Sequence, residues 1–90
     1  MDIAELTMAL CSAAGPAGFE EGAAEIIKRE IAPFVDEVKS DVMGNLIAVK
    51  RCGKADAPVL MLEAHMDEIG FIVTGYDNGY LRFNAIGLHI

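Results

Sequence analysis

The spacing of apolar residues changes at about residue 35, and this change limits the folds that the chain can adopt. Before it, Ile3, Leu6 and Leu10 recur along one helix face, and Ile27 and Ile31 lie one helical turn apart. After it, apolar residues alternate with polar ones or form short runs, which is typical of strands. Two helices followed by mixed strands predict an α/β arrangement.

Local signals set the expected element boundaries. Asp2, with Glu5 three residues later, forms a capping-box pattern at the start of the first helix. The second helix is expected from about Phe19 to Pro33. The expected strands cover residues 35–42, 46–49, 59–62, 70–74 and 81–85.

Two of these strands carry further information. Val59–Leu62 is the most uniformly apolar run, which predicts a strand covered on both faces. Asn78-Gly79 separates the last two strands, and this pair accepts positive φ at low cost. We therefore expect a hairpin there.

The composition is more apolar than so short a chain can hide. Of the 90 residues 53% are hydrophobic and only 23% are charged, and a domain this small buries a modest fraction of its surface. We expect part of the apolar surface to pack against further polypeptide or a partner subunit.

The charge balance argues against two classes of partner. There are 14 acidic and 7 basic residues, a formal net charge of −7, which repels nucleic acid and anionic membrane surfaces. The sequence shows no secretory signal and no apolar run of about 18 residues. A cytoplasmic protein with Cys11 and Cys52 as free thiols is expected.

The stretch after Val59–Leu62 has the clearest chemical pattern. His65 and Asp67 lie two residues apart, so in an extended segment both point to the same side. A neutral imidazole can bind zinc or cobalt while a carboxylate holds its other nitrogen. The same spacing also fits a structural hydrogen-bonded pair. Glu63 and Glu68 could hold the metal ligands in place or be solvated, and we interpret both as solvated side chains.

Four segments resemble, in order and spacing, one known family from about Leu6 to Gly87. They are Gly15–Glu21, Asp41–Ala48, Ala64–Phe71 and Tyr80–Gly87. The family is the glutamyl aminopeptidases, which include deblocking and tetrahedral aminopeptidases. The resemblance implies that residues 1–90 are the amino-terminal part of a metallo-aminopeptidase catalytic domain. This part would end before the small insertion domain that mediates oligomerisation.

The resemblance also implies roles for two residues. His65 would be a ligand of one of two divalent metal ions, usually zinc or cobalt, and Asp67 would be the catalytic-site residue that orients it. The bridging carboxylate, the glutamate base and the late histidine of the family have no counterpart here. His89 has no neighbouring ligand and is not expected to belong to the site.

The implied activity is removal of amino-terminal residues from peptide substrates by a full-length, oligomeric family member. These 90 residues alone are expected to bind metal weakly at most and to have negligible activity. The alternatives are a small non-catalytic α/β binding or interaction module, with His65 and Asp67 in a core hydrogen bond, and a regulatory partner that docks on full-length subunits.

Overall fold

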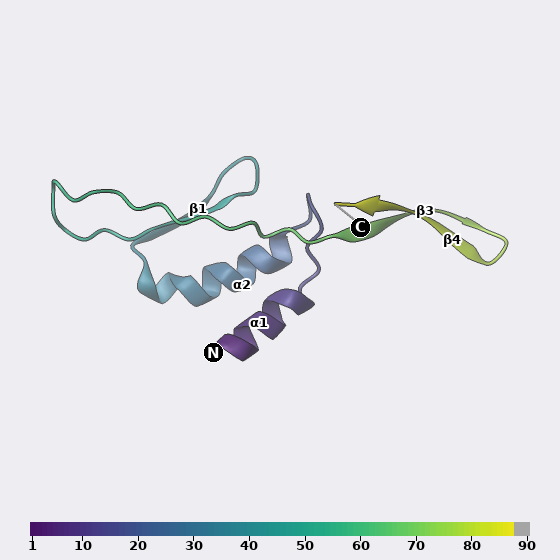
Figure 1. Ribbon diagram of the computed structural model, residues 1–90, viewed down its shortest axis with the longest axis horizontal. Coiled ribbons are helices and arrows are strands. Elements are labelled where there is room, and N and C mark those ends of the chain that lie inside the picture. Colours follow the sequence, from purple (N-terminus) through teal and green to yellow (C-terminus); the bar gives the residue numbers. More distant parts are fainter. Residues whose placement is uncertain (88–90) are drawn as a thin grey trace.

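A computed structural model of the protein describes residues 1–87, which form two helices and two antiparallel hairpins. The elements are α1 (Ile3–Ser12), α2 (Glu21–Ile31), the 3-10 turn η1 (Ala32–Phe34), β1 (Glu37–Ser40), β2 (Leu46–Val49), β3 (Gly70–Asp77) and β4 (Tyr80–Ile86). Figure 1 shows both helices near the β1–β2 hairpin, with the β3–β4 hairpin at the far end of the molecule. The expected class, two helices followed by strands with a hairpin, is confirmed.

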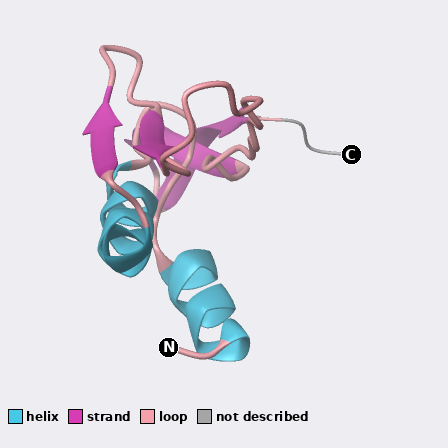
Figure 2. Cartoon of the chain, turned by 90° about the vertical axis from the view of Figure 1, so that its left-hand side faces the viewer, coloured by secondary structure: helices cyan, strands magenta, loops and turns pink. Residues whose placement is uncertain are grey.

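Side-chain hydrogen bonds mark the start of α1, and Pro33 lies just after the end of α2. The Asp2 carboxylate accepts a hydrogen bond from the Glu5 N–H (2.8 Å), and the Glu5 carboxylate accepts one from the Asp2 N–H (3.1 Å), so the capping box is present. Helix α2 begins at Glu21, two residues later than predicted, and passes into η1, which contains Pro33. Figure 2 shows the helices on one side of the strands. No helix within residues 1–87 is long and apolar enough to cross a membrane.

The β1–β2 hairpin closes on a turn built around Asp41. Its carboxylate accepts hydrogen bonds from the backbone N–H groups of Met43 and Asn45, both at 2.9 Å, and from the Asn45 side-chain amide at 2.8 Å. Gly44 adopts φ 86°, which favours glycine. These hydrogen bonds, above all that of the Asn45 side chain, lower the pKa of Asp41.

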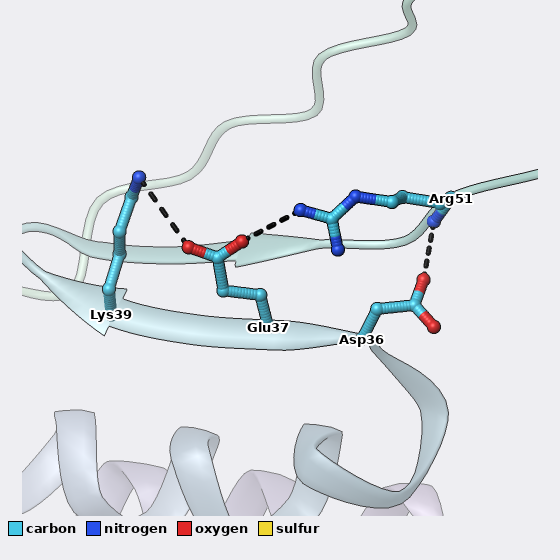
Figure 3. Close-up of polar contacts among 4 residues, drawn as sticks. All are labelled: Asp36, Glu37, Lys39 and Arg51. Atoms are coloured by element: carbon cyan, nitrogen blue, oxygen red, sulfur yellow. Dashed lines mark hydrogen bonds and ion pairs between the residues drawn. The ribbon is translucent and has the colours of Figure 1, made fainter. Parts of the chain in front are cut away.

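Polar contacts also link the open end of this hairpin (Figure 3). The Glu37 carboxylate lies 2.9 Å from the Arg51 guanidinium and 3.7 Å from the Lys39 ammonium. The Arg51 hydrogen bond, followed by the charge of Lys39, lowers the pKa of Glu37. The Arg51 backbone N–H donates to the Asp36 carboxylate.

The β3–β4 hairpin turns at the predicted dipeptide. Asn78 and Gly79 have φ values of 48° and 84°, as a two-residue turn of positive φ requires. Phe71 and Phe83 pack edge to face across the strands, with ring centroids 4.8 Å apart. Both strands are longer than the sequence predicted, because cross-strand pairing continues from Gly70↔Ile86 to the turn.

The prediction of a covered strand at Val59–Leu62 is wrong for the described chain. Residues 59–64 belong to no strand and make no hydrogen bond within residues 1–87. The side chains of Val59–Leu62 are between 76% and 96% exposed. An extended segment becomes a covered strand only when neighbours pair with it, and residues 1–87 supply none.

Residues 1–87 accordingly form no closed core. Of the hydrophobic residues that the structure describes, Ala23 alone is buried. The radius of gyration is 17.5 Å, against about 12 Å for a compact chain of this length. The accessible surface is 7742 Å², against about 5100 Å² for a compact protein of this mass. The apolar excess noted in the sequence therefore lies on the surface.

We predict that acid loosens the β1–β2 hairpin. The pKa values of Asp41 and Glu37 are lower in the folded hairpin than in the unfolded chain. Their stabilisation is therefore complete above the unfolded-state pKa, about 4, and is lost as the pH falls through the lower folded values. NMR amide exchange of β1 and β2, expressed as protection relative to an unfolded peptide at the same pH, should show protection that falls from about pH 6 to about pH 2.

Two matched variants test whether Asp41 causes this pH dependence. Asp41→Asn should remove part of the pH dependence, because the amide cannot ionise and cannot accept all three hydrogen bonds equally well. Asp56→Asn, in a loop where the carboxylate makes no hydrogen bond within residues 1–87, should leave the profile unchanged. Equal profiles for the two variants would contradict the role given to Asp41.

Candidate functional site

His65 and Asp67 are in hydrogen-bond contact. The Nδ1 atom of His65 lies 3.0 Å from Asp67 Oδ1 and 2.9 Å from the Asp67 carbonyl oxygen. The expected hydrogen bond between the two side chains is therefore present. The imidazole is 84% exposed, so this hydrogen bond does not lie in a core, as the binding-module alternative would require.

The contacts of Nδ1 determine which ring nitrogen is free. A carboxylate and a carbonyl oxygen can only accept hydrogen bonds. Nδ1 must therefore carry a proton and act as the hydrogen-bond donor to both. In the neutral ring the lone pair then belongs to Nε2, which makes no hydrogen bond within residues 1–87. A carboxylate that fixes the tautomer of a histidine in this way leaves Nε2 ready to bind a metal ion.

The described residues offer a metal ion few other ligands. No group of three or more His, Cys, Asp or Glu side chains within residues 1–87 could hold one, whereas zinc sites use three or four protein ligands. The residues present therefore fit one ligand position and its orienting carboxylate. His89 lies outside the described residues.

Glu68 is exposed, as interpreted from the sequence, but its carboxylate also binds a backbone group of a distant turn. Its Oε1 accepts a hydrogen bond from the Gly15 N–H at 3.1 Å, and its own N–H donates to the Gly15 carbonyl oxygen at 2.8 Å. Gly15 is buried and the hydrogen bond is part-buried, so this carboxylate satisfies a backbone donor that is partly shielded from water. Glu63 makes no hydrogen bond within residues 1–87, in line with the solvated interpretation.

The turn after α1 thus contacts the segment that carries His65. Pro16 and Glu68 form an isolated parallel β-bridge. A side chain on Gly70 would come within 3.2 Å of the Pro16 ring, so glycine permits this close approach. From the sequence, Gly15 was only part of a segment that resembles the family, and no contact with Glu68 was expected. The signal that could have shown the contact is Gly70, a residue without a side chain just after the motif.

A large groove leads to His65. It has a volume of about 1660 Å³ and is lined by Glu20, by residues 43–55, which include β2, and by residues 57–67. Small-molecule sites usually have volumes of about 300–1,000 Å³. The exposed imidazole therefore stands at the edge of a space that exceeds an ordinary ligand pocket.

The family and the relatives that this chain resembles are aminopeptidases. The M42 glutamyl aminopeptidase family matches residues 44–89. A protein of Acetivibrio thermocellus whose name assigns it to the aminopeptidases is 46% identical over 87 residues, which are 96% of this chain and 26% of that protein. The lysyl aminopeptidase of Pyrococcus furiosus is 39% identical over 85 residues, 92% of this chain and 24% of that enzyme.

A solved structure agrees with these sequences. The TET aminopeptidase of Thaumarchaeota archaeon SCGC AB-539-E09 superposes with a TM-score of 0.82 at 38% identity, over 93% of this chain and 23% of that one. The chain thus spans about a quarter of the length of the relatives that it matches.

We predict that Glu68→Ala frees the Gly15 N–H. Loss of a hydrogen bond from a buried backbone donor to a carboxylate should speed its exchange by about 10-fold or more. NMR amide exchange of Gly15 measures this directly. Glu68→Gln keeps a side-chain oxygen and should retain part of the protection, and Glu63→Ala should change nothing. Unaltered Gly15 exchange in Glu68→Ala would show that the contact does not form in solution.

Proposed function

Because the chain belongs to the M42 glutamyl aminopeptidase family, we propose that it supplies the amino-terminal part of the catalytic domain of a metal-dependent aminopeptidase. The observation that carries the proposal is the His65–Asp67 pair, with Nδ1 held and Nε2 exposed. This pair lies within the residues that the family matches. The aminopeptidase names of the relatives and the TM-score of 0.82 support the same conclusion.

Each residue of the pair has a distinct role in this proposal. His65 would hold one of two divalent metal ions, zinc or cobalt, through Nε2. Asp67 keeps the proton on Nδ1, orients the ring and raises the basicity of the ligand nitrogen. When bound, the metal ions supply Lewis-acid activation of water and of a substrate carbonyl. The substrates in this proposal are peptides with a free amino terminus.

These 90 residues alone should not perform the reaction. One imidazole is too few ligands for tight metal binding, and residues 1–87 contain no cluster of three ligands. We therefore propose that activity and oligomeric assembly require the longer polypeptide found in the relatives, which exceed this chain about fourfold in length.

A chimera tests the proposal. Residues 1–86 of this chain would replace the matching segment of the Pyrococcus furiosus lysyl aminopeptidase, and release of amino-terminal lysine from a peptide would be assayed with added zinc or cobalt. His65→Ala should lower kcat/KM by more than about 100-fold, because it removes a ligand. Asp67→Asn should lower it by about 10–100-fold.

Three controls complete this assay. Glu63→Ala, adjacent in sequence but without a hydrogen bond within residues 1–87, should keep the activity of the chimera. The unaltered enzyme sets full activity, and the 90-residue chain alone should show none. Peptidase activity of the chain alone that His65→Ala abolishes would contradict the proposed inactivity, and full activity of the His65→Ala chimera would contradict the ligand role.

A further inference from the structure

The peptide unit between Asp67 and Glu68 is hydrogen-bonded at both of its ends. Its carbonyl oxygen, which belongs to Asp67, accepts a hydrogen bond from His65 Nδ1 at 2.9 Å. Its N–H, which belongs to Glu68, donates to the Gly15 carbonyl oxygen at 2.8 Å. This peptide unit is trans, so it is planar and its C=O and N–H point in opposite directions. One rigid group therefore has the imidazole on one side and the turn after α1 on the other.

The Glu68 side chain holds the same peptide unit in a second way. Its Oε1 accepts a hydrogen bond from the Gly15 N–H at 3.1 Å, so one residue binds both the backbone donor and the backbone acceptor of Gly15. Two hydrogen bonds to one residue restrict rotation as well as separation. Gly15 is buried, whereas the His65 imidazole is 84% exposed. The buried turn is therefore the fixed end of this linkage, and the exposed ring is the end that it positions.

Close packing supports the contact on both sides of Glu68. A Cβ atom on Gly15 would lie 3.8 Å from the Met66 carbonyl oxygen, and one on Gly70 would lie 3.2 Å from the Pro16 ring. Pro16 also forms the parallel bridge with Glu68. In Figure 1 the link between α1 and α2 lies beside the segment that leads into β3. The turn therefore contacts the chain both before and after Glu68.

We propose that Glu68 is a positioning residue of the metal site, whose two hydrogen bonds with Gly15 set where His65 Nε2 stands relative to the other metal ligands. Asp67 keeps the proton on Nδ1 and orients the ring within its own segment, whereas Glu68 holds that segment in place. Glu68 itself does not bind the metal ion. This role rests on the proposed function, because the position of Nε2 matters only if His65 binds a metal ion.

The alternative role for Glu68 is that of an anchor that contributes to stability alone. The two roles differ in their effect on metal affinity. Zinc–nitrogen bonds are about 2.0–2.1 Å long, so a ligand nitrogen that shifts with its segment binds the ion less tightly. Changes in residues that support metal ligands cost about 10–100-fold in affinity. A purely stabilising anchor would leave the metal affinity of the folded protein unchanged.

Cobalt binding to the lysyl aminopeptidase chimera tests the positioning role. The metal-free chimera would be titrated with cobalt alone, and binding would be followed by the visible absorption of the bound ion. Glu68→Ala should raise the Kd for cobalt by about 10-fold. Glu68→Gln keeps a side-chain oxygen that can accept from the Gly15 N–H, so its Kd should stay within about 3-fold of the parent value.

A matched pair of glycine variants tests the same contact without changing Glu68. Gly70→Ala should also raise the Kd for cobalt, because its Cβ would press on Pro16 at 3.2 Å and displace the turn. Gly75→Ala should leave the Kd unchanged, because its Cβ would meet side-chain atoms of Arg82 at an ordinary 3.9 Å. Neither glycine has a positive φ, so alanine fits the backbone at both positions.

Two further controls separate position from stability and from tautomer. Asp2→Ala removes the cap of α1 and should lower the Tm of the chimera by about 2 °C without changing the Kd for cobalt. In the 90-residue chain, the ¹⁵N chemical shifts of the neutral His65 ring should show the same Nδ1–H tautomer in Glu68→Ala as in the parent. Asp67→Asn should weaken that preference, because Asp67 and not Glu68 contacts Nδ1.

The outcomes distinguish this role from the proposed function. If His65→Ala weakens cobalt binding but Glu68→Ala does not, the positioning role is wrong and the proposed function stands. If His65→Ala leaves the Kd unchanged, both are wrong. If Glu68→Ala does not fold, an unchanged Kd in Gly70→Ala refutes the role. If the chimera itself does not fold, amide exchange of Glu68 in the 90-residue chain decides, because equal rates in the parent and in Gly70→Ala would refute the contact.

Discussion

The contact between Glu68 and Gly15 joins two parts of the molecule that are 53 residues apart in sequence. One partner is the buried Gly15 in the turn after α1, and the other is the segment that carries His65 and Asp67. The two Glu68–Gly15 hydrogen bonds and the adjoining Pro16–Glu68 bridge hold that segment against the helical half. Without this contact no hydrogen bond would join residues 59–68 to the helical half, because residues 59–64 make none within residues 1–87 and His65 bonds only to Asp67 in the same segment.

A short-range interaction with Asp67 sets the orientation of the His65 imidazole. Asp67 fixes the proton on Nδ1 through its side chain and its carbonyl oxygen together. Because both acceptors belong to one residue, the ring orientation requires only that the chain stay extended for two residues. Long-range contacts have a different effect, which is to hold the segment that carries His65 against the helical half of the described residues.

Features that depend on neighbouring residues were predicted from the sequence, whereas features that depend on distant residues were not. The capping box at Asp2 and Glu5 and the turn at Asn78-Gly79 were predicted because their chemistry is complete within a few residues. The His65–Asp67 hydrogen bond was predicted for the same reason. The prediction of a covered strand at Val59–Leu62 was wrong. An apolar run becomes a strand only when other strands pair with it, and the described residues contain no strand paired with this run. The role of Glu68 was missed because nothing in its neighbours indicates a partner at residue 15.

The open edges of Val59–Leu62 also affect how the isolated polypeptide behaves in solution. Short apolar segments with unpaired backbone are starting points for non-native β-aggregation. The excess of negative charge opposes this association at neutral pH, but that repulsion vanishes near the isoelectric point of about 4.5. Colloidal stability of the free chain is therefore set by its surface charge and not by its fold, so mildly acidic or high-salt buffers favour precipitation.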